Sequence, residues 1–171
     1  MVLVVTLESS EKPITESTSL KGCVSRFDEV VAMPRSAPTP CRHPGCGVVL
    51  EWAGYRTIGW GHLCDQNDQP VTEAEAEAYL AADLMTALAA TLRYCPVLAT
   101  EPEGRLAAIV DFTFNLGAGR LQTSTLRRRI NQRDWVSACE ELRRWGCGGG
   151  NVLPGLAARR EAEITYLILK H

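Results

Sequence analysis

The sequence predicts an α+β protein that is mostly helical, with a small β-hairpin lobe followed by a helical C-terminal lobe. Two β-rich runs, "VVLEW" and "YRTIGWGH", flank a short "AG" turn, which predicts a hairpin over residues 48–62. After residue 72, apolar side chains recur with the helical period in several segments, which predicts at least four helices. A cleft between two such lobes is the default place for a ligand.

The hairpin run contains two glycines, Gly59 and Gly61, on either side of Trp60. Glycine weakens a strand, and it usually marks a bend or a place where another group comes close to the backbone. The run therefore predicts one of two arrangements. Either a twisted strand packs Trp60 in the core, or the strand floors a binding cleft with Thr57 pointing into it.

The helical half contains clear start and stop signals. A long periodic helix is predicted over "EAEAEAYLAADLMTALAATLRY", with leucines that step by four along one face. A nearly all-apolar helix, two short amphipathic helices and a closing helix follow. The residues expected to begin or end these helices are Thr72 with Glu75 as a capping box, Gly117, Ser124 or Thr123, Asp134 and Pro154.

Residues 1–22 are predicted to be a flexible leader, because they are polar and rich in Ser, Thr and Glu. Residues 23–171 form the predicted domain, in which residues 34–47 are a Pro/Cys-rich inserted loop. The N-terminal "VLVVTL" is far shorter than the roughly 20 apolar residues that cross a bilayer. It also lacks a basic segment before it, so neither a signal peptide nor a transmembrane segment is expected.

The charges are unevenly distributed along the chain. The net charge is −2, which excludes a strongly basic nucleic-acid binder. Residues 1–102 hold 7 Lys and Arg against 13 Asp and Glu, a net charge of −6, whereas residues 103–171 hold 11 against 7, a net charge of +4. The asymmetry indicates either that one lobe meets an anionic polymer or that its helix faces are simply solvated.

The seven cysteines are an odd number, so they cannot all pair within one chain. Cys41, His43 and Cys46, followed by His62 and Cys64, are residue types that bind zinc. The regular spacing of a zinc knuckle is absent, however. Reduced thiols or a local disulfide are therefore favoured over a metal site.

The order of motifs from residue 54 to residue 171 resembles the bacteriophage-type lysozymes of glycoside hydrolase family 24. The motifs are "GYRTIGWGH", "VTEAEAEAYLAADL", "AAIVDFTFNLGAG", "STLRRRINQRDWVSACEELRRW" and "LPGLAARREAEITYL". The resemblance implies a lysozyme-like two-lobed fold. It also implies a muramidase that hydrolyses the β-1,4 bond between N-acetylmuramic acid and N-acetylglucosamine for host lysis.

The same resemblance has implications for cofactors, binding partners and cellular location. It implies no cofactor and no metal, and a monomer whose partner is the glycan strand of peptidoglycan. Nucleic-acid binding and membrane insertion are not expected. The protein is expected in the host cytoplasm before release, after which it acts on the cell wall.

Glycoside cleavage needs a proton donor and a second group that handles the anomeric centre or its water. The family arranges these as Glu, eight residues, Asp or Cys, five residues, and Thr. Thr57 matches the family's threonine, and counting back places Glu51 at the middle position. Without gaps, Arg42 stands where the acid is expected, and arginine cannot donate a proton at any useful pH.

A gapped alignment restores the acid. "SRFDEVV" resembles the end of the family's first helix, which makes Glu29 the general acid and residues 34–47 an insertion. The second group is Glu51, or Cys41 if the hairpin itself is enlarged. Glu51 is favoured, because a carboxylate is the more capable base for activating water.

The resemblance places four further residues at the sugars, namely Leu63, Phe114, Asn115 and Thr125. Three of them have a structural interpretation as well, Leu63 and Phe114 as core residues and Thr125 as a helix cap. For Leu63 and Phe114 the core interpretation is favoured. His62 is expected to brace the hairpin rather than act as a base.

Other classes of function remain open on the sequence alone. A lysozyme-fold protein without hydrolytic activity would bind the wall or another partner, with Arg42 marking lost catalysis. A zinc-binding nuclease or adaptor would contain stoichiometric zinc. A lytic transglycosylase would leave anhydro-sugar ends instead of reducing ends.

Overall fold

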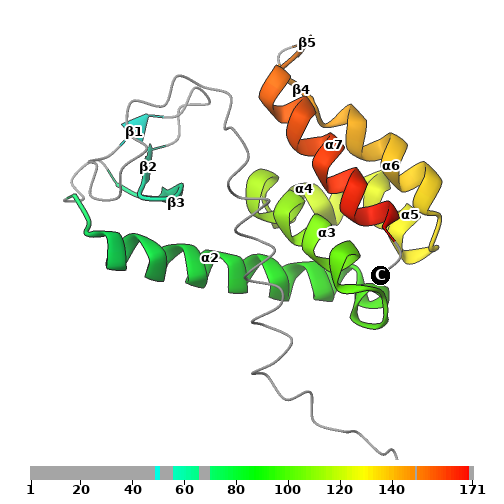
Figure 1. Ribbon diagram of the computed structural model, residues 1–171, viewed down its shortest axis with the longest axis horizontal. Coiled ribbons are helices and arrows are strands. Elements are labelled where there is room, and N and C mark those ends of the chain that lie inside the picture. The colour runs from blue at the N-terminus through cyan, green and yellow to red at the C-terminus, as the bar shows by residue number, and fades with distance from the viewer. Residues whose placement is uncertain (1–48, 51–55, 66–69, 149, 170–171) are drawn as a thin grey trace, which may run out of the picture.

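A small antiparallel sheet opens the described part of the chain (Figure 1). The computed structural model describes residues 49–50, 56–65, 70–148 and 150–169. The sheet has the order β1-β2-β3, with β1 at Val49–Leu50, β2 at Arg56–Ile58 and β3 at His62–Leu63. Thr57 lies on the central strand and is paired with residues of both neighbours. The predicted hairpin is confirmed, and β3 extends it.

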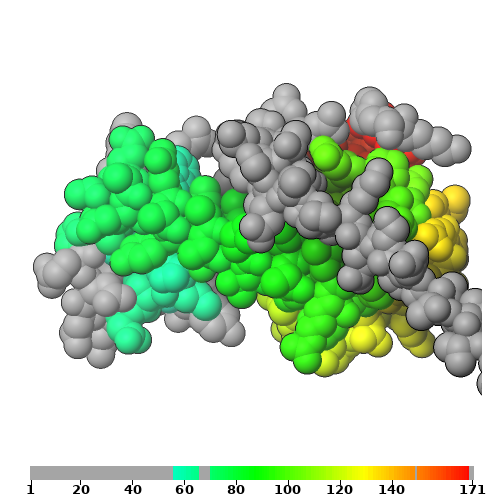
Figure 2. Space-filling model, turned by 90° about the horizontal axis from the view of Figure 1, so that it is seen from below, coloured from blue at the N-terminus to red at the C-terminus, as the bar shows by residue number. Residues whose placement is uncertain are grey.

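Helix α2 spans Glu73–Tyr94, the range that the periodicity predicts. The capping box is confirmed, since the Thr72 hydroxyl accepts from the Glu75 N–H at 3.3 Å and the Thr72 N–H donates to Glu75 Oε2 at 2.8 Å. α2 runs from the sheet to the other helices (Figure 1), and it forms much of the face seen from below (Figure 2). Its buried residues are small, Ala76, Ala87 and Thr91, whereas the predicted leucine stripe is half-buried.

The later elements contain four of the predicted helices and four elements that were not predicted. In chain order they are η1 (Pro96–Thr100), α3 (Glu103–Leu116), α4 (Ala118–Thr123), α5 (Thr125–Asn131), α6 (Trp135–Arg144), β4 (Cys147–Gly148), β5 (Asn151–Val152) and α7 (Pro154–Ile168). The sequence missed η1, α4 and the β4–β5 hairpin. These elements are too short to show a hydrophobic period.

Local signals set the helix ends as predicted. α3 stops at Gly117, whose φ of +88° suits glycine. The Ser124 hydroxyl caps α5 by accepting from the Arg127 N–H at 3.0 Å. Asp134 caps α6 in the same way through the Ser137 N–H at 3.2 Å.

The main hydrophobic core lies among α3 to α7. Phe112 is fully buried, and Trp145 meets its ring edge-on with 5.5 Å between centroids. Cys95 and Cys139 belong to the same core and form no disulfide. Burial raises the pKa of Cys95 to about 12 and raises that of Cys139, so both remain thiols at neutral pH. Among the described residues, no helix is both long and apolar enough to cross a membrane.

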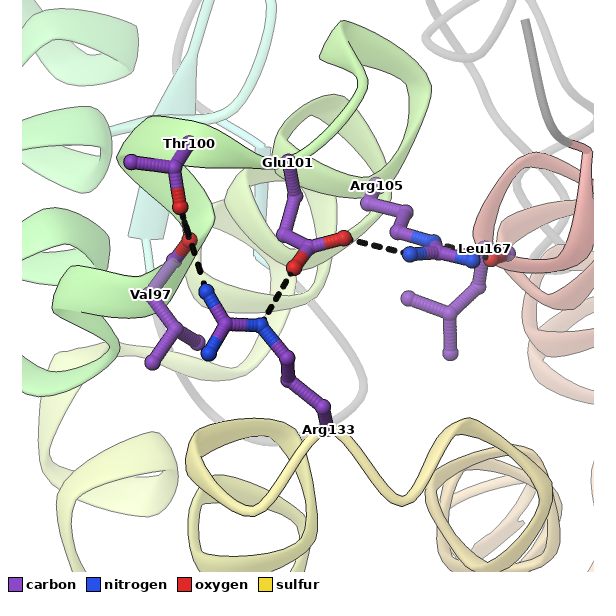
Figure 3. Close-up of polar contacts among 6 residues, drawn as sticks. All are labelled: Val97, Thr100, Glu101, Arg105, Arg133 and Leu167. Atoms are coloured by element: carbon purple, nitrogen blue, oxygen red, sulfur yellow. Dashed lines mark hydrogen bonds and ion pairs between the residues drawn. The ribbon is translucent and has the colours of Figure 1, made fainter.

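Glu101 ties three distant segments together at one end of the helical lobe (Figure 3). Its carboxylate accepts a short hydrogen bond from Arg105 and another from Arg133 Nε at 2.7 Å. Arg105 also donates to the Leu167 carbonyl at 3.1 Å and lies over the Trp135 ring. This network links the start of α3, the α5–α6 turn and the end of α7.

Candidate active site

The two predicted carboxylates lie outside the described residues. Glu29 and Glu51, together with Cys41 and Arg42, stay predictions. Thr57, the third predicted catalytic residue, is on the central strand β2 and is buried. It stands directly opposite Leu63 in the sheet, so the two side chains share one face.

The turn between β2 and β3 explains the two glycines. Gly59 and Gly61 both have positive φ, +58° and +103°, and the Gly61 N–H donates to the Ile58 carbonyl at 3.2 Å. A Cβ on Gly59 would lie 2.8 Å from the Ala76 Cβ. The close approach that the glycine signals is therefore made by α2, and it sets the distance between the hairpin and this helix.

Gly59→Ala is expected to destabilise the fold by about 1–3 kcal/mol, because the added methyl overlaps α2 in a packed contact. The positive φ adds backbone strain. Urea unfolding measures the loss. The matched control is Gly119→Ala in α4, where a Cβ meets nothing within 4 Å and alanine favours the helix. Equal stability of Gly59→Ala and the wild type would show that this contact does not hold the hairpin.

His62 braces the hairpin, as the sequence predicts. Its Nδ1 lies 2.9 Å from Asp83 Oδ2, and its ring stacks on Tyr79 with 4.4 Å between centroids. Both partners are on α2. The contacts hold β3, and with it Leu63, against the long helix.

For two of the residues placed at the sugars, the alternative structural interpretation is wrong, and their contact with sugars stays a prediction. Leu63 is 65% exposed, so it is not a core residue, because β3 is the edge strand of the sheet. Thr125 is not the cap of α5, since Ser124 fills that role and the Thr125 hydroxyl accepts from Arg128 at 3.1 Å. Phe114 is half-buried and packs against a buried cluster of α2 and α3 residues, Ala87, Ala107 and Val110, in agreement with its core interpretation.

Asn115 belongs to a buried polar cluster that the sequence analysis missed. Its Oδ1 accepts from Arg160 Nη2 at 3.0 Å, and the same nitrogen donates to Glu163 at 2.5 Å. Beside them, Arg159 binds both carboxylate oxygens of Asp111. The signal was present, because Asp111 and Asn115 are one turn apart in the mostly apolar second half of this helix.

The cluster places ionisable side chains where water does not reach. The side chains of Arg160, Glu163 and Asp111 are all 0% exposed. Burial raises the pKa of Glu163 well above its ordinary value against the opposing attraction of Arg160. Burial lowers the pKa of Arg160 as well, but a guanidinium starts so high that it keeps its proton.

The described residues of the predicted site are thus spread over four elements, β2, β3, α3 and α5. Thr57 and Leu63 lie on the sheet, Phe114 and Asn115 on α3, and Thr125 at the start of α5. Among the described residues, no group of His, Cys, Asp and Glu is arranged to hold a metal ion. The loop residues considered for zinc, Cys41, His43 and Cys46, lie outside the described ranges.

A small sheet joined by one long helix to a helical lobe defines the class as lysozyme-like. The fold is similar to that of the muramidase domain of SpmX from Asticaccaulis excentricus, with a TM-score of 0.64 over 87% of this chain and 96% of that one at 22% identity. It is also similar to the endolysin from Escherichia coli O157:H7 phage FAHEc1, with a TM-score of 0.59 over 72% and 84% of the two chains at 27% identity.

The family follows from the sequence comparison. The Phage lysozyme model matches residues 46–163, and the chain belongs to this family. A SAR-endolysin of bacteriophage PS119 is 41% identical over 112 residues, which are 64% of this chain and 66% of that protein. The chain thus spans just under two thirds of the length of this relative.

Proposed function

We propose that this protein is a muramidase that hydrolyses the β-1,4 bond between N-acetylmuramic acid and N-acetylglucosamine in peptidoglycan, for host lysis. The observation that carries the proposal is Thr57, the match to the family's threonine. It lies on the central strand of a sheet whose edge strand β3 is braced against α2, with the exposed Leu63 beside it. Family membership and the endolysin relative support the same reaction.

In the proposed reaction, Glu29 protonates the glycosidic oxygen as its bond to the anomeric carbon breaks. Glu51 takes a proton from the water that attacks this carbon, and Thr57 positions that water. Leu63, Phe114, Asn115 and Thr125 contact the sugars. The scheme needs no cofactor or metal, and the protein acts as a monomer on the wall after release from the host cytoplasm.

The test is the loss of turbidity of isolated cell walls, with mass spectrometry of the fragments. Hydrolysis gives reducing ends, whereas a transglycosylase gives anhydro-sugar ends and would contradict the proposed reaction. A second function is favoured by Arg42, which stands at the acid's position when no gap is allowed. Wall binding in a pull-down without loss of turbidity would support this binding-only protein.

The basic surface of α5 is expected to help the protein dock on an anionic wall. Among the described residues, Arg127 and Arg128 have no carboxylate partner, whereas the neighbouring Arg129 pairs with Asp134 at 3.3 Å. Replacing Arg127 and Arg128 with Glu should weaken wall binding several-fold, most clearly at low salt where screening is least.

Cosedimentation with walls at two salt concentrations measures this effect. The matched control compares Arg128→Glu with Arg93→Glu, since Arg93 is an exposed arginine in the last turn of α2. If both single variants weaken binding equally, the effect comes from net charge and not from the α5 surface. Unchanged binding of the double variant at low salt would mean that these arginines are only solvated.

A further inference from the structure

The Arg160 guanidinium is a rigid donor between α7 and α3. It is fully buried, it donates through Nη2 to Glu163 at 2.5 Å, and it lies 5.3 Å from the Phe112 ring centroid. The same Nη2 donates to Asn115 Oδ1 at 3.0 Å. The carboxamide of Asn115 therefore contacts a guanidinium whose orientation is fixed by burial and by its bond to Glu163.

A guanidinium has donors and no acceptor, so it selects one orientation of the carboxamide. The oxygen of Asn115 must face Arg160, and the Nδ2 amino group must point elsewhere. Asn115 is half-buried, and its Nδ2 donates to no other described residue. A carboxamide without this neighbour could present either end, because the two ends have nearly the same shape.

Stability alone does not account for Arg160. Within the described part of the chain, its Nε and Nη1 are buried without a hydrogen-bond partner. Unpaired buried donors and acceptors lower stability. The neighbouring pair of Arg159 and Asp111 joins the same two helices with both carboxylate oxygens engaged.

We propose that Arg160 is a positioning residue that orients Asn115 so that its Nδ2 donates to an acceptor oxygen of the bound glycan strand. The inference rests on the proposed function. The acceptor is either the carbonyl of a 2-acetamido group or a sugar hydroxyl, both of which accept from an amide N–H. Arg160 acts through Asn115 and does not touch the sugar.

The first experiment uses Asn115→Asp, which keeps the size of the side chain and the acceptor for Arg160 but removes the donor. Calorimetric titration with soluble, uncross-linked peptidoglycan glycan strands should show a dissociation constant about tenfold higher than that of the wild type. Hydrolysis should show the same rise in KM with kcat within about twofold. Thermal unfolding of each variant confirms that equal folded fractions are compared.

Arg160→Lys and Arg159→Lys separate positioning from packing. Lysine keeps the charge but loses the planar arrangement of donors. Arg160→Lys should raise KM and the dissociation constant in the same direction as Asn115→Asp, whereas Arg159→Lys should lower the midpoint of thermal unfolding and leave KM unchanged. Equal KM changes in the two lysine variants, or wild-type affinity in either Asn115→Asp or Arg160→Lys, would overturn the proposal.

De-N-acetylated glycan strands distinguish the two acceptors. If Nδ2 donates to an acetamido carbonyl, the wild type loses affinity on this substrate and Asn115→Asp loses nothing further. If Nδ2 donates to a hydroxyl, Asn115→Asp raises the dissociation constant by the same factor on both substrates. If the wild type neither binds nor cleaves these strands, both the proposed function and this inference are contradicted. If the wild type cleaves them and the variants have the same KM and dissociation constant as the wild type, only the inference is contradicted.

Discussion

Glu29→Gln is expected to reduce the rate of wall lysis by a factor of roughly 10² to 10⁴, because it removes the proton that the leaving oxygen needs while keeping the shape of the side chain. The residue follows from the gapped alignment in which "SRFDEVV" contains the acid. Activity is compared at equal folded fraction, judged by thermal unfolding. The neighbouring Asp28→Asn is the matched control, and it should retain activity.

Substitutions of the other two proposed catalytic residues test the rest of the reaction. Glu51→Gln should also lower the rate, and Thr57→Ala tests whether the hydroxyl positions the attacking water. Thr57 is buried on the central strand, so its variant needs the same check of folding. Full activity of Glu29→Gln with complete loss in Glu51→Gln would show that the gapped alignment is wrong.

Arg159→Met should lower the free energy of unfolding by about 3–5 kcal/mol, the usual cost of leaving one partner of a buried ion pair without the other. Asp111 is 0% exposed, and both of its carboxylate oxygens are bound by Arg159. Without the Arg159 guanidinium, this carboxylate loses both of its hydrogen bonds to that group and has no water to replace them. Urea unfolding measures the loss.

The matched control is Arg143→Met. Arg143 pairs with Glu161 at 2.8 Å, but the two side chains are 52% and 56% exposed, so about 0–1 kcal/mol is expected. The double variant Asp111→Val with Arg159→Met should recover most of the stability, since an apolar pair can replace a buried ion pair. A loss under about 1 kcal/mol in Arg159→Met would show that the buried pair does not stabilise the contact between α3 and α7.

The helix ends are the part of the fold that sequence reasoning predicted best. The capping box at Thr72, the glycine stop at Gly117 and the caps at Ser124 and Asp134 are all present. Each signal acts within about four residues along the chain, so its partners are visible in the sequence. The motif order from residue 54 onward also identified the lysozyme-like class before any packing was known.

Exposure and long-range pairing were predicted less well. Leu63 was expected in the core because it is apolar, but it lies on an edge strand and is 65% exposed. Gly59 was recognised as a place of close approach, but only the structure shows that Ala76 is the neighbour. In both cases the outcome depends on which element packs against the residue, and periodicity within one segment does not contain that information.

The sequence by itself determined the class of the protein and the limits of its principal helices, because these follow from motifs and from contacts between near neighbours. Only the tertiary structure decided that Asp111 and Asn115 meet Arg159 and Arg160, since these partners are 48 and 45 residues apart. The packing of α3 on α7 removes Asp111 and the two guanidinium groups from water, whereas Asn115 stays half-buried. A buried guanidinium needs oxygen atoms that accept its hydrogen bonds, so the carboxamide of Asn115 turns its oxygen toward Arg160.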